Sequence, residues 1–135
     1  MSLQFSTAVR NAILDAIETQ IGTSAVLKIR TGVAPADCGQ ADSGTVLATL
    51  SLPSDWMAAA SSGSKAKSGT WQDSSADATG TAAHFRLYAS DGTTVHAQGT
   101  VTATGGGGDM TVDNTSFASG QAFTISTFTL TAPGA

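Results

Sequence analysis

The sequence predicts one mainly β domain, a β-sandwich or jelly-roll of six to eight short antiparallel strands, preceded by one amphipathic N-terminal α-helix. Three observations predict this fold. The chain has 135 residues, the size of a single ordinary domain. Apolar residues recur with the period of a helix only near the N-terminus. After position 22 apolar and polar residues alternate in short segments, which are separated by turns rich in Gly, Asp and Ser. We therefore divide the domain, residues 1–135, into a helical segment over 1–22 and a β body over 23–135.

The predicted helix covers about Thr7–Gln20. Its apolar residues repeat at every fourth position, at Val9, Ile13, Ile17 and Ile21. Ser6 is placed to cap the N-terminus with its hydroxyl, and Gly22 can adopt the left-handed conformation that ends many helices. We expect the opposite side of the helix to face water or a partner protein, because it carries Arg10, Asp15, Glu18 and Gln20. The helix is therefore a candidate contact element.

Two half-buried strands are expected next, over Ala25–Thr31 and Thr45–Leu52, because their apolar residues recur at every second position. The segment between them, Gly32–Gly44, is rich in Gly, Asp and Pro and long enough to be a functional or contact loop. A short helical turn is expected within Pro53–Ala60, followed by a mobile surface stretch within Ser61–Lys67.

The segment Thr81–Thr102 is predicted to be a β-hairpin. A three-residue loop, Ser90-Asp91-Gly92, would pair Leu87 with Val95 and Phe85 with Ala97. One face of the hairpin is then apolar, and the other carries His84, Arg86, Tyr88, Thr94, His96 and Gln98. A two-residue loop would set an apolar side chain opposite His96, so we reject that register.

The predicted last strand covers Gln121–Thr131. In a regular strand, the apolar side chains of its first half would lie on one face and those of its second half on the opposite face. A bulge near Ser126-Thr127 would bring both sets to the core. Short strands are also expected within Gly69–Asp73 and Asp109–Asp113.

Composition and charge exclude several classes of function. Only 12% of residues are charged, and six Lys and Arg against ten Asp and Glu give a net charge of −4. Such a chain lacks the basic surface that binds phosphates, so we expect no nucleic-acid partner and no anionic membrane partner. The first residues show no signal peptide, which predicts a soluble protein that is made in a cytoplasm. Cys38 is the only cysteine, so an internal disulfide is impossible.

Two short motifs resemble catalytic or binding motifs only superficially. Gly105–Gly108 could cradle a phosphate, but neither the Lys nor the helix that completes such a site follows, so a flexible turn is the better interpretation. Ser62 and Lys65 match the Ser-x-x-Lys pattern of penicillin-interacting enzymes without its companion motifs, which favours coincidence.

His84 and His96 could lie diagonally on one face of the hairpin and hold a metal with a third ligand, which the sequence does not supply. We prefer to interpret them as a surface or interface pair whose protonation could modulate contacts. Cys38 is interpreted as a small packing residue or an incidental thiol, because no base can be assigned to activate it.

The remaining candidates are aspartates and tryptophans. The aspartates at 73, 77, 109 and 113 could gather around a cation, although structural roles in turns are favoured. Trp56 and Trp71 are expected in the core or at a subunit interface, with a sugar-stacking platform as the alternative. We assign no catalytic, cofactor-binding or metal-ligating residue and expect a protein that is neither an enzyme nor a cofactor carrier.

Three stretches resemble sequences of tailed bacteriophages and prophages, and the similarity extends over most of the chain. They are Leu52–Met57 through Ser68–Trp71, Gly80–Arg86, and Gly105–Asp113. The resemblance implies a small virion structural protein, and a small all-β chain of this kind looks most like a capsid cement or decoration protein.

The resemblance also implies which partners the protein would bind. A cement protein would bind the major capsid protein and copies of itself, as a dimer or trimer, on the capsid exterior. The alternatives are a tail or head–tail connector component, which copy number in the particle would distinguish, and a carbohydrate-binding tail module with Trp56 or Trp71 as its platform. A glycan contact is therefore left open.

Overall fold

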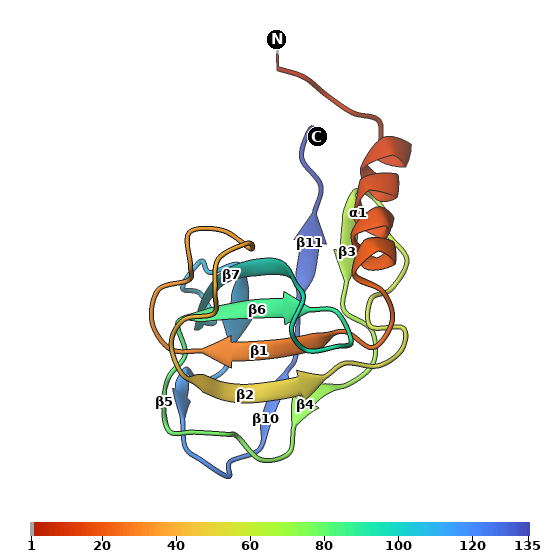
Figure 1. The fold of residues 1–135 in the computed structure, drawn as a ribbon. Coiled ribbons are helices and arrows are strands. Elements are labelled where there is room, and N and C mark those ends of the chain that lie inside the picture. Colours follow the sequence, from red (N-terminus) through yellow and green to blue (C-terminus); the bar gives the residue numbers. More distant parts are fainter. Residues whose placement is uncertain (1) are drawn as a thin grey trace.

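A computed structural model describes residues 2–135 of the chain. These residues form one helix and eleven strands: α1 Thr7–Ile21, β1 Val26–Arg30, β2 Val46–Ser51, β3 Ser64–Ala66, β4 Trp71–Asp73, β5 Gly80–Thr81, β6 His84–Tyr88, β7 Val95–Ala103, β8 Met110–Val112, β9 Ser116–Phe117, β10 Phe123–Ile125 and β11 Thr129–Thr131. The mainly β fold with one N-terminal helix is confirmed (Figure 1). The number of strands exceeds the expected six to eight because several ladders contain only two or three residues per strand.

The ends of α1 follow the predicted capping chemistry. The Ser6 hydroxyl accepts a hydrogen bond from the Val9 N–H at 3.3 Å, which satisfies one of the free donors of the first turn. Gly22 has a φ of +92° and donates its N–H to the Glu18 carbonyl at 2.9 Å. A residue with a side chain would be strained in this conformation, so glycine ends the helix here.

The largest sheet has five strands in the order β2-β1-β6-β7-β8. All its neighbours are antiparallel except β7 and β8, which run parallel, whereas we expected antiparallel strands throughout. To run parallel, the chain must reverse its direction twice between Ala103 and Met110, and the glycine run Gly105–Gly108, with positive φ at Gly105 and Gly107, makes so short a connection possible. A Cβ atom at Gly106 or Gly108 would lie 2.7 or 2.9 Å from Thr102 side-chain atoms. The run is therefore a tight structural connection and not a phosphate cradle.

The hairpin of β6 and β7 has a different register from the one we predicted. Leu87 pairs with Ala97 and Phe85 with Gly99, so each partner lies two residues further along β7 than expected. A shift of two preserves the face on which each side chain lies, because side chains alternate with a period of two. The apolar and polar faces of β6 were therefore predicted correctly from a register that was wrong.

Asp91 causes the change of register. Its Oδ1 accepts hydrogen bonds from the backbone N–H groups of Thr93 and Thr94, at 2.8 and 2.9 Å. Because of these bonds Thr93 belongs to the loop and not to β7. The hydrogen bond next to the loop therefore runs from the Ala89 N–H to the Thr94 carbonyl. Gly92 has the expected positive φ of +71°. A further irregularity between Leu87 and Tyr88 accommodates the extra residue.

The core lies between the apolar face of the five-stranded sheet and three two-stranded ladders, β10-β4, β11-β3 and β5-β9 (Figure 1). Aromatic rings connect the two sides. Trp71 lies with its ring centroid 6.1 Å from that of Trp56 and 5.6 Å from that of Phe128, which in turn contacts Phe85 at 5.9 Å. Both tryptophans are fully buried, so their prediction as core residues is confirmed.

The segment predicted as a single last strand is two strands. β10 pairs with β4 and β11 pairs with β3, and the chain between them leaves both ladders. Ile125 and Phe128 are both buried on either side of this break. The position at which the apolar side chains change from one face to the other was thus predicted correctly. The cause is a change of pairing partner, from β4 to β3, and not a bulge.

Two predictions between residues 53 and 67 are wrong. Pro53–Ala60 contains no helical turn, because Trp56 and Met57 use their backbone groups to bridge to Ser68 and Lys67. Ser61–Lys67 is not a mobile surface stretch, since it holds β3 and its turn. These long-range ladder bonds outweigh the local preference of an Ala- and Ser-rich sequence.

Candidate functional site

The long loop between β1 and β2 lies over the polar face of β6 and is fixed there by Arg86. The Arg86 side chain is only 1% exposed. Its nitrogens donate to Asp42 Oδ1 at 2.6 Å, Asp37 O at 2.9 Å, Gln40 O at 3.0 Å and Gln98 Oε1 at 3.0 Å. Three of these four acceptors belong to the loop, so one buried guanidinium determines how the loop folds back over the sheet.

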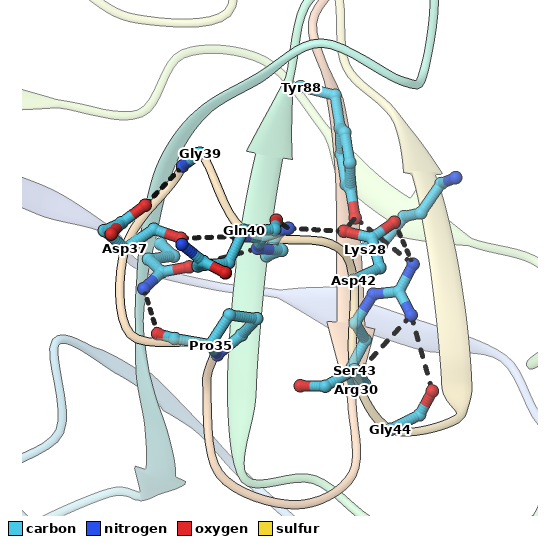
Figure 2. A network of polar contacts seen from close by, with 12 residues as sticks. Lys28, Arg30, Pro35, Asp37, Gly39, Gln40, Asp42, Ser43, Gly44 and Tyr88 are labelled. Carbon is cyan, nitrogen blue, oxygen red and sulfur yellow. Dashed lines mark hydrogen bonds and ion pairs between the residues drawn. The ribbon is translucent and has the colours of Figure 1, made fainter.

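Asp42 is the carboxylate that two arginines share. Its Oδ2 accepts from Arg30 at 2.8 Å, and its Oδ1 accepts from Arg86 and, at 2.9 Å, from the Tyr88 hydroxyl (Figure 2). Burial alone would raise the pKa of Asp42, but the hydrogen bonds from Arg86 and Tyr88 and the charges of both arginines lower it. Burial, with the hydrogen bond to Asp42, raises the pKa of Tyr88.

This network fixes the β1–β2 loop, and its groups are poorly placed to accept or donate a proton in a reaction. Arginine stays protonated, the Asp42 carboxylate is occupied by three donors, and the Tyr88 hydroxyl is held in its protonated form. The outward part of the loop is different, because Val33 is 90% exposed. The loop therefore presents an apolar side chain from a fixed position, which suits a contact with another protein.

The side of α1 that faces the β body carries polar and charged side chains in addition to the buried Leu14 and Ile21. Lys65 of β3 is 2% exposed, and its Nζ contacts Asp15 Oδ1 at 2.7 Å, Glu18 Oε2 at 2.8 Å and the Ala58 carbonyl at 2.8 Å. The hydrogen bond from Lys65 lowers the pKa of Asp15. Burial would lower the pKa of Lys65, but the hydrogen bonds and charges of the two carboxylates outweigh it and raise the pKa.

Further polar contacts lie on the same side of α1. Arg10 donates to the Ala132 carbonyl at 3.0 Å, and Asn11 Oδ1 accepts from the Gly63 N–H at 2.8 Å. Of the four residues that we expected to face water or a partner, Gln20 is exposed, but Arg10, Asp15 and Glu18 contact their own domain, so the expected orientation was wrong for these three. The reason is that β3 and its turn present a buried ammonium and unpaired backbone groups, which only the polar side of the helix can satisfy.

The apolar side of α1 is consequently left partly open. Val9 is 44% exposed, Ile13 and Ile17 are half-buried, and Ala8, Ala12 and Ala16 are exposed. An open groove of about 300 Å³ runs between this side and His96 of β7. Of the predicted apolar stripe, only Ile21 is fully buried, together with Leu14. The helix thus presents uncharged, largely apolar surface to its surroundings.

The two histidines do not form a pair. His84 is buried and pairs in the sheet with Thr100, four residues along β7 from His96. At about 3.3 Å per residue that separation exceeds the reach of a diagonal pair. His84 Nδ1 lies 2.7 Å from the Gly32 carbonyl, so the ring supports the loop. The interpretation as a surface pair is therefore wrong for His84.

Within residues 2–135, no group of three or more His, Cys, Asp or Glu side chains could hold a metal ion. Asp73 and Asp77 accept hydrogen bonds from Thr49, and Asp109 accepts from Thr100, which are structural roles as we favoured for these three, whereas Asp113 makes no such bond within residues 2–135. Cys38 is half-buried in the β1–β2 loop.

Lys65 of the Ser-x-x-Lys match is held as a protonated ion-pair partner and cannot serve as a base. Trp56 and Trp71 are buried, so neither can be a platform for a sugar ring. The sequence did not single out Asp42 or Lys65 as the centres of polar networks, because both depend on residues far away in the chain.

In comparisons with known proteins, no family model, no curated protein and no solved structure matches this chain. The resemblance to phage proteins therefore stays a prediction. In the described part of the chain, no helix has the length and apolar character needed to cross a membrane.

Proposed function

We propose that this chain is a non-enzymatic structural protein of a tailed-phage particle, a cement or decoration protein that binds the outside of the major capsid lattice and copies of itself. The observation that carries the proposal is the orientation of α1. The helix contacts its own domain through charged and polar side chains as well as through Leu14 and Ile21, and it leaves Val9 exposed and Ile13 and Ile17 only partly covered. Apolar helix faces of this kind are typical of protein–protein contacts.

A second copy of the chain fits the apolar face of α1. Val9, Ile13, Ala16 and Gln20 follow one another at intervals of four, three and four residues, the spacing by which one helix packs along another. The three charged residues of the helix are directed toward the β body, so two copies of this acidic chain can meet here without repulsion. A twofold contact of this face with itself would be self-complementary.

The surface chemistry favours binding over catalysis. The buried ionisable groups with altered pKa values, Lys65 and Tyr88, are held in their protonated forms by neighbours. The small side chains that dominate the composition lose little conformational entropy when buried. Across a symmetric lattice, many weak contacts of this kind would add to firm attachment.

The proposal is tested first by electron cryo-microscopy of phage particles that contain the chain. The expected result is density outside the shell, between capsomers, with a copy number comparable with that of the major capsid protein. Density at the portal or the tail, with few copies, would favour the connector or tail alternative and overturn the cement assignment.

The self-contact is tested by sedimentation of the purified chain. The wild-type chain is expected to be a dimer, which is the assembly that a twofold contact closes, and Val9→Asp combined with Ile13→Asp is expected to be a folded monomer, because the introduced charges would have to be desolvated. Thr23→Asp adds a charge at an exposed position just after the helix and should leave the oligomer intact. A wild-type monomer, or an oligomer that the double variant retains, would contradict the contact through α1.

A further inference from the structure

A second surface feature lies away from α1, where the chain passes from β8 through β9 to β10. An open groove of about 300 Å³ is formed there by residues 113–126, at the lower end of the range for small-molecule sites. Phe117 at the end of β9 and Phe123 at the start of β10 line it, together with polar side chains from the connecting segments.

The floor of the groove is aromatic. The rings of Phe117 and Phe123 lie with their centroids 4.4 Å apart and their planes inclined by 43°. Phe117 is buried, whereas Phe123 is only half-buried and leaves part of its ring accessible from the groove. Such a ring offers an apolar surface against which the C–H groups of a ligand can pack.

The rim of the groove carries free hydrogen-bonding groups of both kinds. Asn114 Oδ1 accepts from the Ser116 N–H at 2.9 Å, and Gln121 Oε1 accepts from the Ala118 N–H at 3.2 Å. Because the backbone N–H groups must meet oxygen, both side-chain NH₂ groups are left as donors. The Asp113 carboxylate makes no hydrogen bond or ion pair within residues 2–135 and provides strong acceptors beside them.

We propose that this groove binds a neutral saccharide. Sugar hydroxyls donate and accept, so they can pair with the Asp113 carboxylate and with the amide donors of Asn114 and Gln121 at the same time. The C–H face of the sugar ring packs on Phe123. One carboxylate and two amides can thus bind the hydroxyl groups of a pyranose, while the accessible aromatic ring packs against its C–H face.

Other ligand classes fit the groove less well. No Lys, Arg or His lines it, so a phosphate or carboxylate ligand would meet Asp113 without a compensating positive charge. A purely apolar ligand would bury the Asp113 carboxylate without a partner. A divalent cation would find a single carboxylate, fewer acidic ligands than calcium sites use. The proposal is independent of the position of the chain in a particle.

The test is a titration of the full-length ¹⁵N-labelled chain, followed by NMR, with a panel of neutral mono- and disaccharides up to about 50 mM, a concentration that would reveal binding with a millimolar Kd. Glucose, galactose, mannose and N-acetylglucosamine, with their β-linked disaccharides, form the panel. At least one member is expected to give saturable shifts confined to amides of residues 113–126. No saturable shift with any member, or shifts spread over the whole chain, would overturn the proposal.

Two variants make the test specific. Asp113→Ala is expected to weaken binding about tenfold, because it removes a charged acceptor, and Phe123→Leu is expected to weaken it while keeping an apolar residue at that position. Asp55→Ala removes a charge from an exposed site that does not line the groove and should bind like the wild-type chain. Unchanged affinity in Asp113→Ala, or saturable binding of inorganic phosphate at the same amides in place of a sugar, would also overturn the proposal.

Discussion

Replacing Asp42 by Asn tests whether the shared carboxylate determines how the β1–β2 loop is held. The change leaves the guanidinium groups of Arg30 and Arg86 buried without their counter-charge. Removing one partner of a buried ion pair costs about 3–5 kcal/mol. The Asp42 side chain is 37% exposed, so water offsets part of this loss. We therefore expect the free energy of unfolding to fall by about 2 kcal/mol, and Tm by about 6–8 °C for a domain of this size.

Urea unfolding measures this loss, and Asp37→Asn is the matched control. Asp37 lies in the same loop and carries the same charge, but its exposed carboxylate accepts only from the Gly39 N–H, which Asn can replace. We expect the control to stay within about 0.5 kcal/mol of the wild-type chain. If Asp42→Asn loses no more stability than Asp37→Asn, then the arginines do not depend on this carboxylate and our account of the loop is wrong.

The same pair of variants gives a pH dependence. The folded-state pKa of Asp42 lies below its ordinary value of 3.8, so the unfolded chain binds the proton more readily. The stabilisation from Asp42 is therefore present above about pH 4 and is lost as the pH falls through the folded-state pKa. Asp42→Asn should accordingly show a shallower loss of stability in acid than Asp37→Asn does. An identical acid profile in the two variants would contradict the lowered pKa.

Three further predictions concern other parts of the molecule. Lys65→Met should destabilise the attachment of α1 by about 1–2 kcal/mol, because Asp15 and Glu18 lose their partner but can turn toward water, and hydrogen exchange should accelerate in α1 more than in β6. Gly44→Ala should cost more than Gly32→Ala in unfolding experiments. Both residues have positive φ, but only at Gly44 would the new Cβ lie 2.0 Å from the Thr31 carbonyl oxygen. Self-association should change little between low and high salt in sedimentation experiments, because the proposed contact is uncharged; a strong salt dependence would point to a different interface.

Local signals in the sequence predicted the parts of the fold that local chemistry decides. Ser6 and Gly22 marked the ends of α1 because capping involves only a few neighbouring residues. The alternation of apolar residues located β1 and β2 for a similar reason. The hairpin register failed because one side chain, Asp91, captures two backbone N–H groups and lengthens the loop, which strand alternation alone does not encode.

The features on which our proposals rest depended on residues far apart in the sequence. The orientation of α1 is decided by Lys65, which is buried fifty residues beyond Asp15, and an amphipathic pattern on its own cannot reveal a buried cation in the body it packs against. The groove floor needs Phe117 and Phe123 to meet across the β9–β10 connection, which follows only from the pairing of β9 with β5 and of β10 with β4.

The distribution of positive charge links the fold to the proposed role. All six Lys and Arg side chains donate to a carbonyl or carboxylate of their own chain. Arg30, Lys65 and Arg86 are buried as well, and Lys28 lies over the Tyr88 ring at 4.8 Å. Arg10 and Lys65 thus connect α1 to the β body, Arg30 and Arg86 hold the long loop, and Lys28 and Lys67 pair with the carbonyls of Gly92 and Gly69. With the positive charges paired inside the chain, the contact that we propose with a second copy lies on the uncharged, partly exposed apolar side of α1.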